Sequence, residues 1–247
     1  LVGVEELVRT HQFYFVADEA SIVHCLLNPN NSGFVIRATD LRANFRALRM
    51  SSPDVQFFIE PSSLNKHYSS VETPFIIDSE PNLFGQDTLH DVLDRQREVG
   101  SFCAMLPVGQ IRLGDSDTLK KVLNEANNIN RNDVVIPLIM DSGWLNDPTL
   151  VNQIIQVILR SHHLVALAFA NSNNPLGSKR RILEYRRIFA STEGRSIAYR
   201  GDLSAVDAYA HGAASAVIGS LPSLRRATPP GSNGRAQKPT DRSPHML

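Results

Sequence analysis

The chain has 247 residues, 42% of them hydrophobic and 20% charged, so it is large enough to form one substantial globular core. Its 25 basic and 25 acidic residues balance, which argues against a dedicated nucleic-acid-binding protein, because such proteins usually carry a basic excess. The two cysteines, Cys25 and Cys103, are far apart, which excludes a disulfide framework and a cysteine-rich zinc site.

No run approaches the roughly 20 apolar residues that a membrane-spanning helix needs, and no signal peptide is visible at the first residues. Free thiols are typical of a reducing compartment. We therefore predict a cytoplasmic protein without a membrane partner. No metal-binding or nucleotide-binding signature occurs, so no cofactor and no metal is predicted.

Eight short apolar runs follow one another along the chain, and helix-like segments follow most of them. The runs span 34–40, 55–61, 75–79, 102–107, 134–142, 164–172, 196–202 and 215–220. They are continuous rather than alternating, as strands covered on both faces should be. Helix-start signals such as Asp147-Pro148 stand where the intervening helices should begin.

This repetition predicts an α/β fold, a (β/α)8 TIM barrel of parallel strands over residues 34–227. Residues 1–33 fall outside the repeat and are predicted to be a short N-terminal extension. Residues 228–247 are rich in proline, glycine and arginine and poor in apolar residues, so we expect a flexible, disordered or extended tail.

Candidate catalytic residues follow from the fold, because TIM-barrel active sites form at the carboxyl ends of the strands. Three aspartates close predicted strands and are the candidate catalytic carboxylates: Asp78, Asp141 and Asp202. Other polar residues at strand ends are candidates for substrate binding: Glu60, Asn171 and Arg200. The alternative for each carboxylate is a structural role as a helix cap or ion-pair partner.

A phosphate site is predicted at the ends of the seventh and eighth runs, where many barrels bind phosphate through backbone N–H groups. Gly201 and Gly219 would allow close approach of an anion, with Ser220 beside them, and Arg225 and Arg226 would add positive charge. Glycine at strand ends is also ordinary turn chemistry, so both interpretations stay open.

Three stretches together resemble the tRNA-guanine transglycosylase family. "TPFIIDSEPNLF" (73–84) resembles that family's P-x-x-x-D-S-G-G-F segment, and "VLDRQREVGSFCAML" (92–106) resembles its Q-R-x-L-G-S-D-I-x-M run. Residues 199–231 resemble its closing segment, which ends in L-P-T-R. The resemblance covers roughly residues 73–231 and implies a barrel that exchanges a guanine in nucleic acid, with Asp78 as one functional carboxylate.

The chain departs from that family's pattern at residues that carry its chemistry. Ile218 stands where the family has its nucleophilic aspartate, and Pro107 stands where it has a base-recognising carboxylate. Glu80 and Pro81 replace two glycines, and the zinc-binding Cys/His insertion is missing. Since an aliphatic side chain cannot hold a sugar covalently, base exchange by the family mechanism is not expected unless Asp141 or Asp202 takes over.

Three functions stay open. The first is a divergent transglycosylase-like barrel that binds or acts on a purine-like base in nucleic acid or a nucleoside. The others are a barrel enzyme acting on a small phosphorylated metabolite and a non-catalytic subunit with a protein partner or a second copy of the chain. A basic face joining Arg225-Arg226 to the segment 179–187 would favour nucleic acid, and a mouth plugged by the chain itself would favour the non-catalytic subunit.

Overall fold

A computed structural model describes residues 13–16, 32–38, 48, 50, 55–77 and 87–232. Within these ranges, eight strands form one sheet: β1 (Phe13–Val16), β2 (Ser32–Arg37), β3 (Gln56–Glu60), β4 (Ala104–Met105), β5 (Val134–Asp141), β6 (Leu164–Ala170), β7 (Ser196–Gly201) and β8 (Ser215–Gly219). Their order is β3-β2-β1-β8-β7-β6-β5-β4, and every strand pair is parallel. The predicted TIM-barrel-like α/β fold is therefore confirmed.

The barrel is nearly closed, and its seam lies between β3 and β4 at the two ends of the strand order. One backbone hydrogen bond crosses the seam, from the N–H of Phe102 to the carbonyl of Phe57 at 2.9 Å. Further along, the side chain of Gln96 takes the place of a neighbouring strand. Its carboxamide donates to the carbonyl of Met105 and accepts from the N–H of Met105, both at 2.9 Å.

Seven of the eight strands were identified from the sequence, and the prediction that the third run forms a strand was wrong. Of the run 75–79, the described residues 75–77 make only an isolated antiparallel bridge, Phe75 to Val108. These residues are apolar because they pack against the segment before Val108, where the N–H of Ile76 donates to the carbonyl of Pro107 at 2.7 Å. The missing strand is β1, which pairs with β2 and β8 from inside the predicted N-terminal extension. This strand has only four residues, which are too few to show a periodic pattern of apolar side chains.

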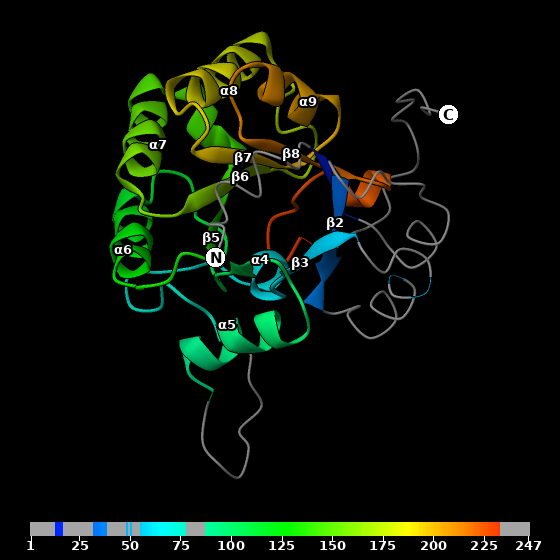
Figure 1. The fold of residues 1–247 in the computed structure, drawn as a ribbon. Helices are drawn as coiled ribbons and strands as arrows, with labels where there is room; N and C mark the ends of the chain where they lie inside the picture. The colour runs from blue at the N-terminus through cyan, green and yellow to red at the C-terminus, as the bar shows by residue number, and fades with distance from the viewer. Residues whose placement is uncertain are drawn as a thin grey trace.

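Helices lie around the outside of the barrel beside β4–β8, as Figure 1 shows. These are α5 (Leu89–Glu98), α6 (Ser116–Asn127), α7 (Pro148–Arg160), α8 (Lys179–Ser191) and α9 (Leu203–Ala210). The short α4 (Ser63–Lys66) instead lies near the centre of the view beside β3. Two 3-10 helices, η2 (Ser142–Asn146) and η3 (Pro222–Leu224), follow β5 and β8. Side-chain caps start α5 to α9, whereas α4 has no side-chain cap. Asp147 accepts a hydrogen bond from the N–H of Thr149 at 2.8 Å, and Pro148 follows it in the first turn of α7. No helix in the described ranges is long and apolar enough to cross a membrane.

Alternate residues of each strand divide the core into layers. Inside the barrel lie side chains such as Tyr14, Phe58 and Tyr199, while Ile136 and Ala198 pack outward against the helices. Outside β2 and β3, Leu48 packs with Phe34, Ile36 and neighbouring apolar residues. Complete burial of these side chains stabilises the fold by about 1.5–3 kcal/mol for each large aliphatic or aromatic residue.

The carboxyl end of the barrel, its mouth, is crossed by residues 224–228, which we call the mouth strap. Leu224 and Ala227 are buried in the cluster that fills the barrel interior. The carbonyl of Ala227 accepts from the N–H of Asn171 at 3.2 Å, and the carbonyl of Thr228 accepts from the side chain of Gln110 at 2.8 Å. The chain itself therefore fills the centre of the mouth.

Candidate functional site

The most elaborate polar cluster at the mouth surrounds Glu60, the last residue of β3, which is 1% exposed. Its carboxylate accepts from the hydroxyl of Tyr199 at 2.5 Å, from Nε of Arg200 at 2.7 Å and from the amide of Asn65 at 3.0 Å. Nη2 of Arg200 completes a bidentate pair with it. We call these four residues the rim cluster. Since a carboxylate offers about four lone-pair positions, Glu60 is fully satisfied.

The backbone at Arg200 has a left-handed conformation, with φ of 52°, that side-chain-bearing residues rarely adopt. The pairing of β7 with β8 shifts register between Ala198 and Gly201. In a regular strand, Tyr199 and Arg200 would point to opposite faces. The irregularity instead allows both side chains to reach Glu60. Such strain is held in place by its surroundings and is characteristic of functional sites.

Two opposing effects determine whether the carboxylate of Glu60 in the rim cluster is charged. Burial alone would raise the pKa of Glu60, but the charge of Arg200 and the hydrogen bonds from Arg200, Tyr199 and Asn65 outweigh it, so this pKa lies below its ordinary value. Burial and the neighbouring carboxylate raise the pKa of Tyr199 well above its usual range. The cluster therefore contains a carboxylate, a guanidinium and a neutral phenol, and Glu60 is a poor general base.

Two adjoining pockets lie beside the rim cluster. The first, which we call the rim pocket, measures about 250 Å³ and is polar. It is bounded by the ends of β2, β3 and β7, by α4 and by the mouth strap: Arg37, Ala38, Glu60, Pro61, Ser62, Asn65, Lys66, Arg200, Ser223, Arg226 and Thr228.

The second pocket, which we call the apolar pocket, measures about 230 Å³. It lies between the end of β3 and α5: Ala38, Ile59, Pro61, Ser62, Ser63, Ile76, Ile77, Asp87, Val92, Arg95, Gln96 and Pro107. Ala38, Pro61 and Ser62 line both pockets, so the two share a wall.

Asp141 and Asn171, at the ends of neighbouring strands β5 and β6, serve local turns. Oδ1 of Asp141 accepts from the N–H of Gly143 at 2.7 Å and caps η2. Oδ1 of Asn171 accepts from the N–H of Asn173 at 2.9 Å, and its amide donates to the hydroxyl of Ser142 at 2.6 Å. These contacts match the structural alternative, and neither residue lines the rim pocket or the apolar pocket.

Asp202 and Gly201 lie at the start of α9. Asp202 is the N-cap and accepts from the N–H of Ser204 at 2.9 Å. A Cβ on Gly201 would come within 2.6 Å of the Cβ of Ala205, so this glycine allows the helix to pack close to the strand end. Both features account for these residues without a ligand.

The predicted phosphate loop after β8 is packed against its own chain. A Cβ on Gly219 would lie 2.3 Å from the carbonyl carbon of Leu224, so the close approach is made by η3 and the strap. Nε of Arg225 donates to the carbonyl of Gly219 at 3.2 Å, and the N–H of Ser220 donates to the carbonyl of Val16 at 2.9 Å. Of this predicted group, Arg226 alone lines the rim pocket.

The remaining catalytic candidate, Asp78, lies outside the described residues, as do Glu80 and Pro81. The described chain stops at Ile77, which lines the apolar pocket. Sequence reasoning missed Tyr199, Asn65 and Lys66. Tyr199 directly precedes the candidate Arg200, and its aromatic ring is typical of a core residue. Asn65 and Lys66 lie in α4, which is too short to show a helical pattern of apolar residues.

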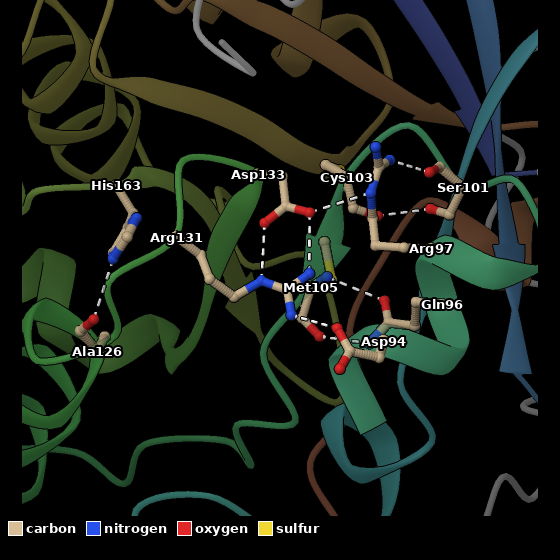
Figure 2. A network of polar contacts seen from close by, with 10 residues as sticks. All are labelled: Asp94, Gln96, Arg97, Ser101, Cys103, Met105, Ala126, Arg131, Asp133 and His163. Atoms are coloured by element: carbon tan, nitrogen blue, oxygen red, sulfur yellow. Dashed lines mark hydrogen bonds and ion pairs between the residues drawn. The ribbon is translucent and has the colours of Figure 1, made fainter. Parts of the chain in front are cut away.

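Part of the second stretch that carried the family resemblance joins a polar network with Arg131 and Asp133, which directly precede β5, as Figure 2 shows. Nε of Arg97 pairs with Asp133 at 3.0 Å, and Nη1 of Arg97 donates to the carbonyl of Ser101. Arg131 binds the same carboxylate through two hydrogen bonds of 2.9 and 3.0 Å. With Asp94, which accepts from Arg131 at 2.5 Å, we call these residues the base network. Arg97 and Ser101 of this stretch therefore support the barrel near the start of β5, whereas Val92 and Gln96 of the same stretch line the apolar pocket.

The basic segment 179–187 is largely occupied by neighbouring groups. Arg186 makes two hydrogen bonds of 2.8 Å to Asp207 on α9, and Arg187 pairs with Glu184 at 2.7 Å. Arg181 donates to the side chain of Asn146 at 2.9 Å. These contacts weaken the case for a basic nucleic-acid-binding stripe along α8. Among the described residues, no three His, Cys, Asp or Glu side chains gather as a metal site would require.

Neither a scan of protein-family models nor a search of curated proteins found a match to this chain. The barrel agrees with the resemblance to the tRNA-guanine transglycosylase family, but a barrel of this kind is compatible with many functions.

Proposed function

We propose that this barrel binds a purine-like base of a nucleoside or nucleic acid in the apolar pocket and does not exchange it. The observation that carries the proposal is the position of this pocket. Its wall includes Ile76 and Ile77, which belong to the stretch that resembles the transglycosylase base-binding segment. Ile59, Val92 and Pro107 provide further apolar surface against which a flat ring can pack.

The size of the pocket supports a single ring system. At about 230 Å³ it falls below the roughly 300–1,000 Å³ that drug-sized ligands occupy. Its polar wall residues include Ser62 and the ion pair of Asp87 with Arg95 at 2.5 Å, and these side chains bring hydrogen-bonding groups to the wall where the edge of a base would lie.

The proposed lack of base exchange is supported by the surroundings of the residues that would perform it. Ile218, at the place of the family's nucleophile, packs against the outer core between sheet and helices rather than inside the barrel. Among the described candidates, Asp141 and Asp202 cap helices, and Glu60 is held by four hydrogen bonds. A double displacement needs a carboxylate that can attack the sugar.

A second candidate, a non-catalytic subunit of a larger complex, is favoured by the mouth strap. Leu224 and Ala227 fill the position at which a substrate would enter the barrel. This candidate and base binding are compatible, since the apolar pocket lies beside the filled centre.

The test is calorimetric titration of the protein with guanine and with a 7-deazaguanine base. We expect binding to the wild type and loss of binding in Val92→Phe, which places a ring in the pocket from α5. Val206→Phe, on the exposed face of α9, is the matched control and should bind normally. No binding by the wild type, or equal binding by Val92→Phe, would contradict the proposal. A labelled-guanine exchange assay on RNA should show no incorporation.

A further inference from the structure

The rim pocket is lined by charged side chains that take no part in the proposed binding of a base in the apolar pocket. Four of its lining side chains are cationic, Arg37, Lys66, Arg200 and Arg226, and one is a carboxylate, Glu60. Glu60 is already neutralised by the bidentate pair with Arg200 and by hydrogen bonds from Tyr199 and Asn65. Among the described residues that line the pocket, Arg200 and Lys66 therefore present positive charge to a ligand, and an anion complements them.

Arg200 is the fixed one of these two cations. The carboxylate of Glu60 accepts hydrogen bonds from Nε and from one N–H of Nη2, and these two bonds fix the plane of the guanidinium. Its Nη1 makes one long contact, 3.4 Å, to the carbonyl of Arg226. A guanidinium has five N–H groups, so some remain for a ligand in the pocket that Arg200 lines. The contacts with Glu60 and the surrounding structure hold the strained, left-handed backbone at Arg200 in place.

Lys66 supplies a second cation, on a flexible stem, to the same pocket. It is the last residue of α4, it is exposed, and it lines the same pocket. An ammonium on a flexible stem adapts to a phosphate as a point charge, whereas a held guanidinium gives directional hydrogen bonds. The pair fits the oxygens of a phosphate group.

The two pockets share Ala38, Pro61 and Ser62, so a ligand can lie across this wall with one part in each. An apolar slot beside a cationic one matches a base joined through a sugar to a phosphate. We propose that the rim pocket is a phosphate subsite and that the ligand is a mononucleotide with a purine-like base. This inference rests on the proposed function for the base.

A mononucleotide is favoured over a nucleic-acid strand by the charges outside the pocket. A strand would continue along a basic track. On α8, however, Arg186 is paired with Asp207 and Arg187 with Glu184, and the chain as a whole has no net charge.

The experiment is calorimetric titration of the full chain with guanosine, guanosine monophosphate, inorganic phosphate and a short single-stranded oligonucleotide. Lys66→Glu is the test variant, and Lys179→Glu, on exposed α8, is the matched control with the same change of charge. We expect the monophosphate to bind wild type at least tenfold more tightly than guanosine, as a charge-assisted contact predicts. Lys66→Glu should abolish this advantage without changing the affinity for guanosine, and Lys179→Glu should retain it.

The results separate the two proposals. Equal affinity for guanosine and its monophosphate, or an advantage that survives Lys66→Glu, would overturn the phosphate subsite while leaving base binding intact. Binding of inorganic phosphate that is lost in Lys66→Glu, with no binding of guanosine, would support the phosphate subsite and reject the base site. Tighter binding of the oligonucleotide than of the monophosphate, weakened by Lys179→Glu, would overturn the assignment to a mononucleotide.

Discussion

Each end of the barrel carries a cluster in which arginine pairs with carboxylate, and the two clusters differ in burial. In the rim cluster, the side chains of Arg200 and Glu60 are 4% and 1% exposed. In the base network, those of Arg131 and Asp133 are 19% and 21% exposed. The rim cluster also has a strained backbone and a pocket beside it, whereas the residues of the base network line neither of the two mouth pockets. The comparison shows that the rim cluster is the more deeply buried of the two and the one with a strained backbone, which is why we propose a ligand site there and a supporting role for the base network.

Removing the charge of Glu60 should have the largest effect on stability. In Glu60→Gln the guanidinium of Arg200 stays buried without its counter-ion, and breaking a buried pair in this way costs about 3–5 kcal/mol. We expect the free energy of unfolding in urea to fall by that amount. A loss below about 1 kcal/mol would show that water reaches Arg200 and that the cluster is not truly buried.

Lowering the pH should protonate the same carboxylate. The resulting loss in the free energy of unfolding should be no greater than the loss caused by Glu60→Gln. The pKa of Glu60 lies below its ordinary 4.5 in the folded protein, so the unfolded chain takes up this proton first as the pH falls. The stability that Glu60 contributes is complete above pH 4.5 and is lost as the pH falls through its folded pKa. Urea titrations at several pH values should show a steeper acid decline for wild type than for Glu60→Gln. Parallel declines would contradict the shift.

The next largest loss of stability is expected at the seam between β3 and β4, beside the base network. Gln96→Ala leaves the N–H and the carbonyl of Met105 without their partners in a buried position. Unsatisfied buried groups cost about 1–3 kcal/mol each, so we expect a loss of about 2 kcal/mol or more, measured by urea unfolding. Hydrogen exchange at Met105 should also accelerate. Gln156→Ala, an exposed amide on α7, is the control and should leave both measurements unchanged.

The smallest effect is expected in the base network itself. Asp133→Asn removes a carboxylate whose arginine partners remain accessible to water, so the loss should be about 1 kcal/mol. Added salt should reduce the difference between variant and wild type, because exposed ion pairs are screened. A loss as large as that of Glu60→Gln, insensitive to salt, would remove the distinction between the two ends.

The sequence predicted the barrel because seven of its strands are continuous apolar runs separated by well-capped helices. It misplaced the eighth strand for two physical reasons. β1 has only four residues, and the run at 75–77 is apolar because it packs against the segment at 107–108 without joining the sheet.

The site was predictable in part. Glu60 and Arg200 were identified because polar residues at strand ends face the mouth of a barrel. Their pairing was not, because it depends on a register shift and a left-handed residue that no local pattern indicates. In the motif at Gln96–Ser101, which carried part of the family resemblance, Arg97 and Ser101 belong to the base network, while Gln96 bonds to Met105 and also lines the apolar pocket. A short motif can therefore be explained by the architecture of a fold as well as by its chemistry.

The central claim is that the carboxyl end of the barrel holds a base beside Ile77 and a phosphate beside Lys66. A crystal structure of the protein soaked with guanosine monophosphate tests it most directly. The account predicts density for the ring between Ile59 and Val92 and for the phosphate near Arg200 and Lys66. Density elsewhere on the molecule, or an empty apolar pocket beside an occupied surface site, would contradict it.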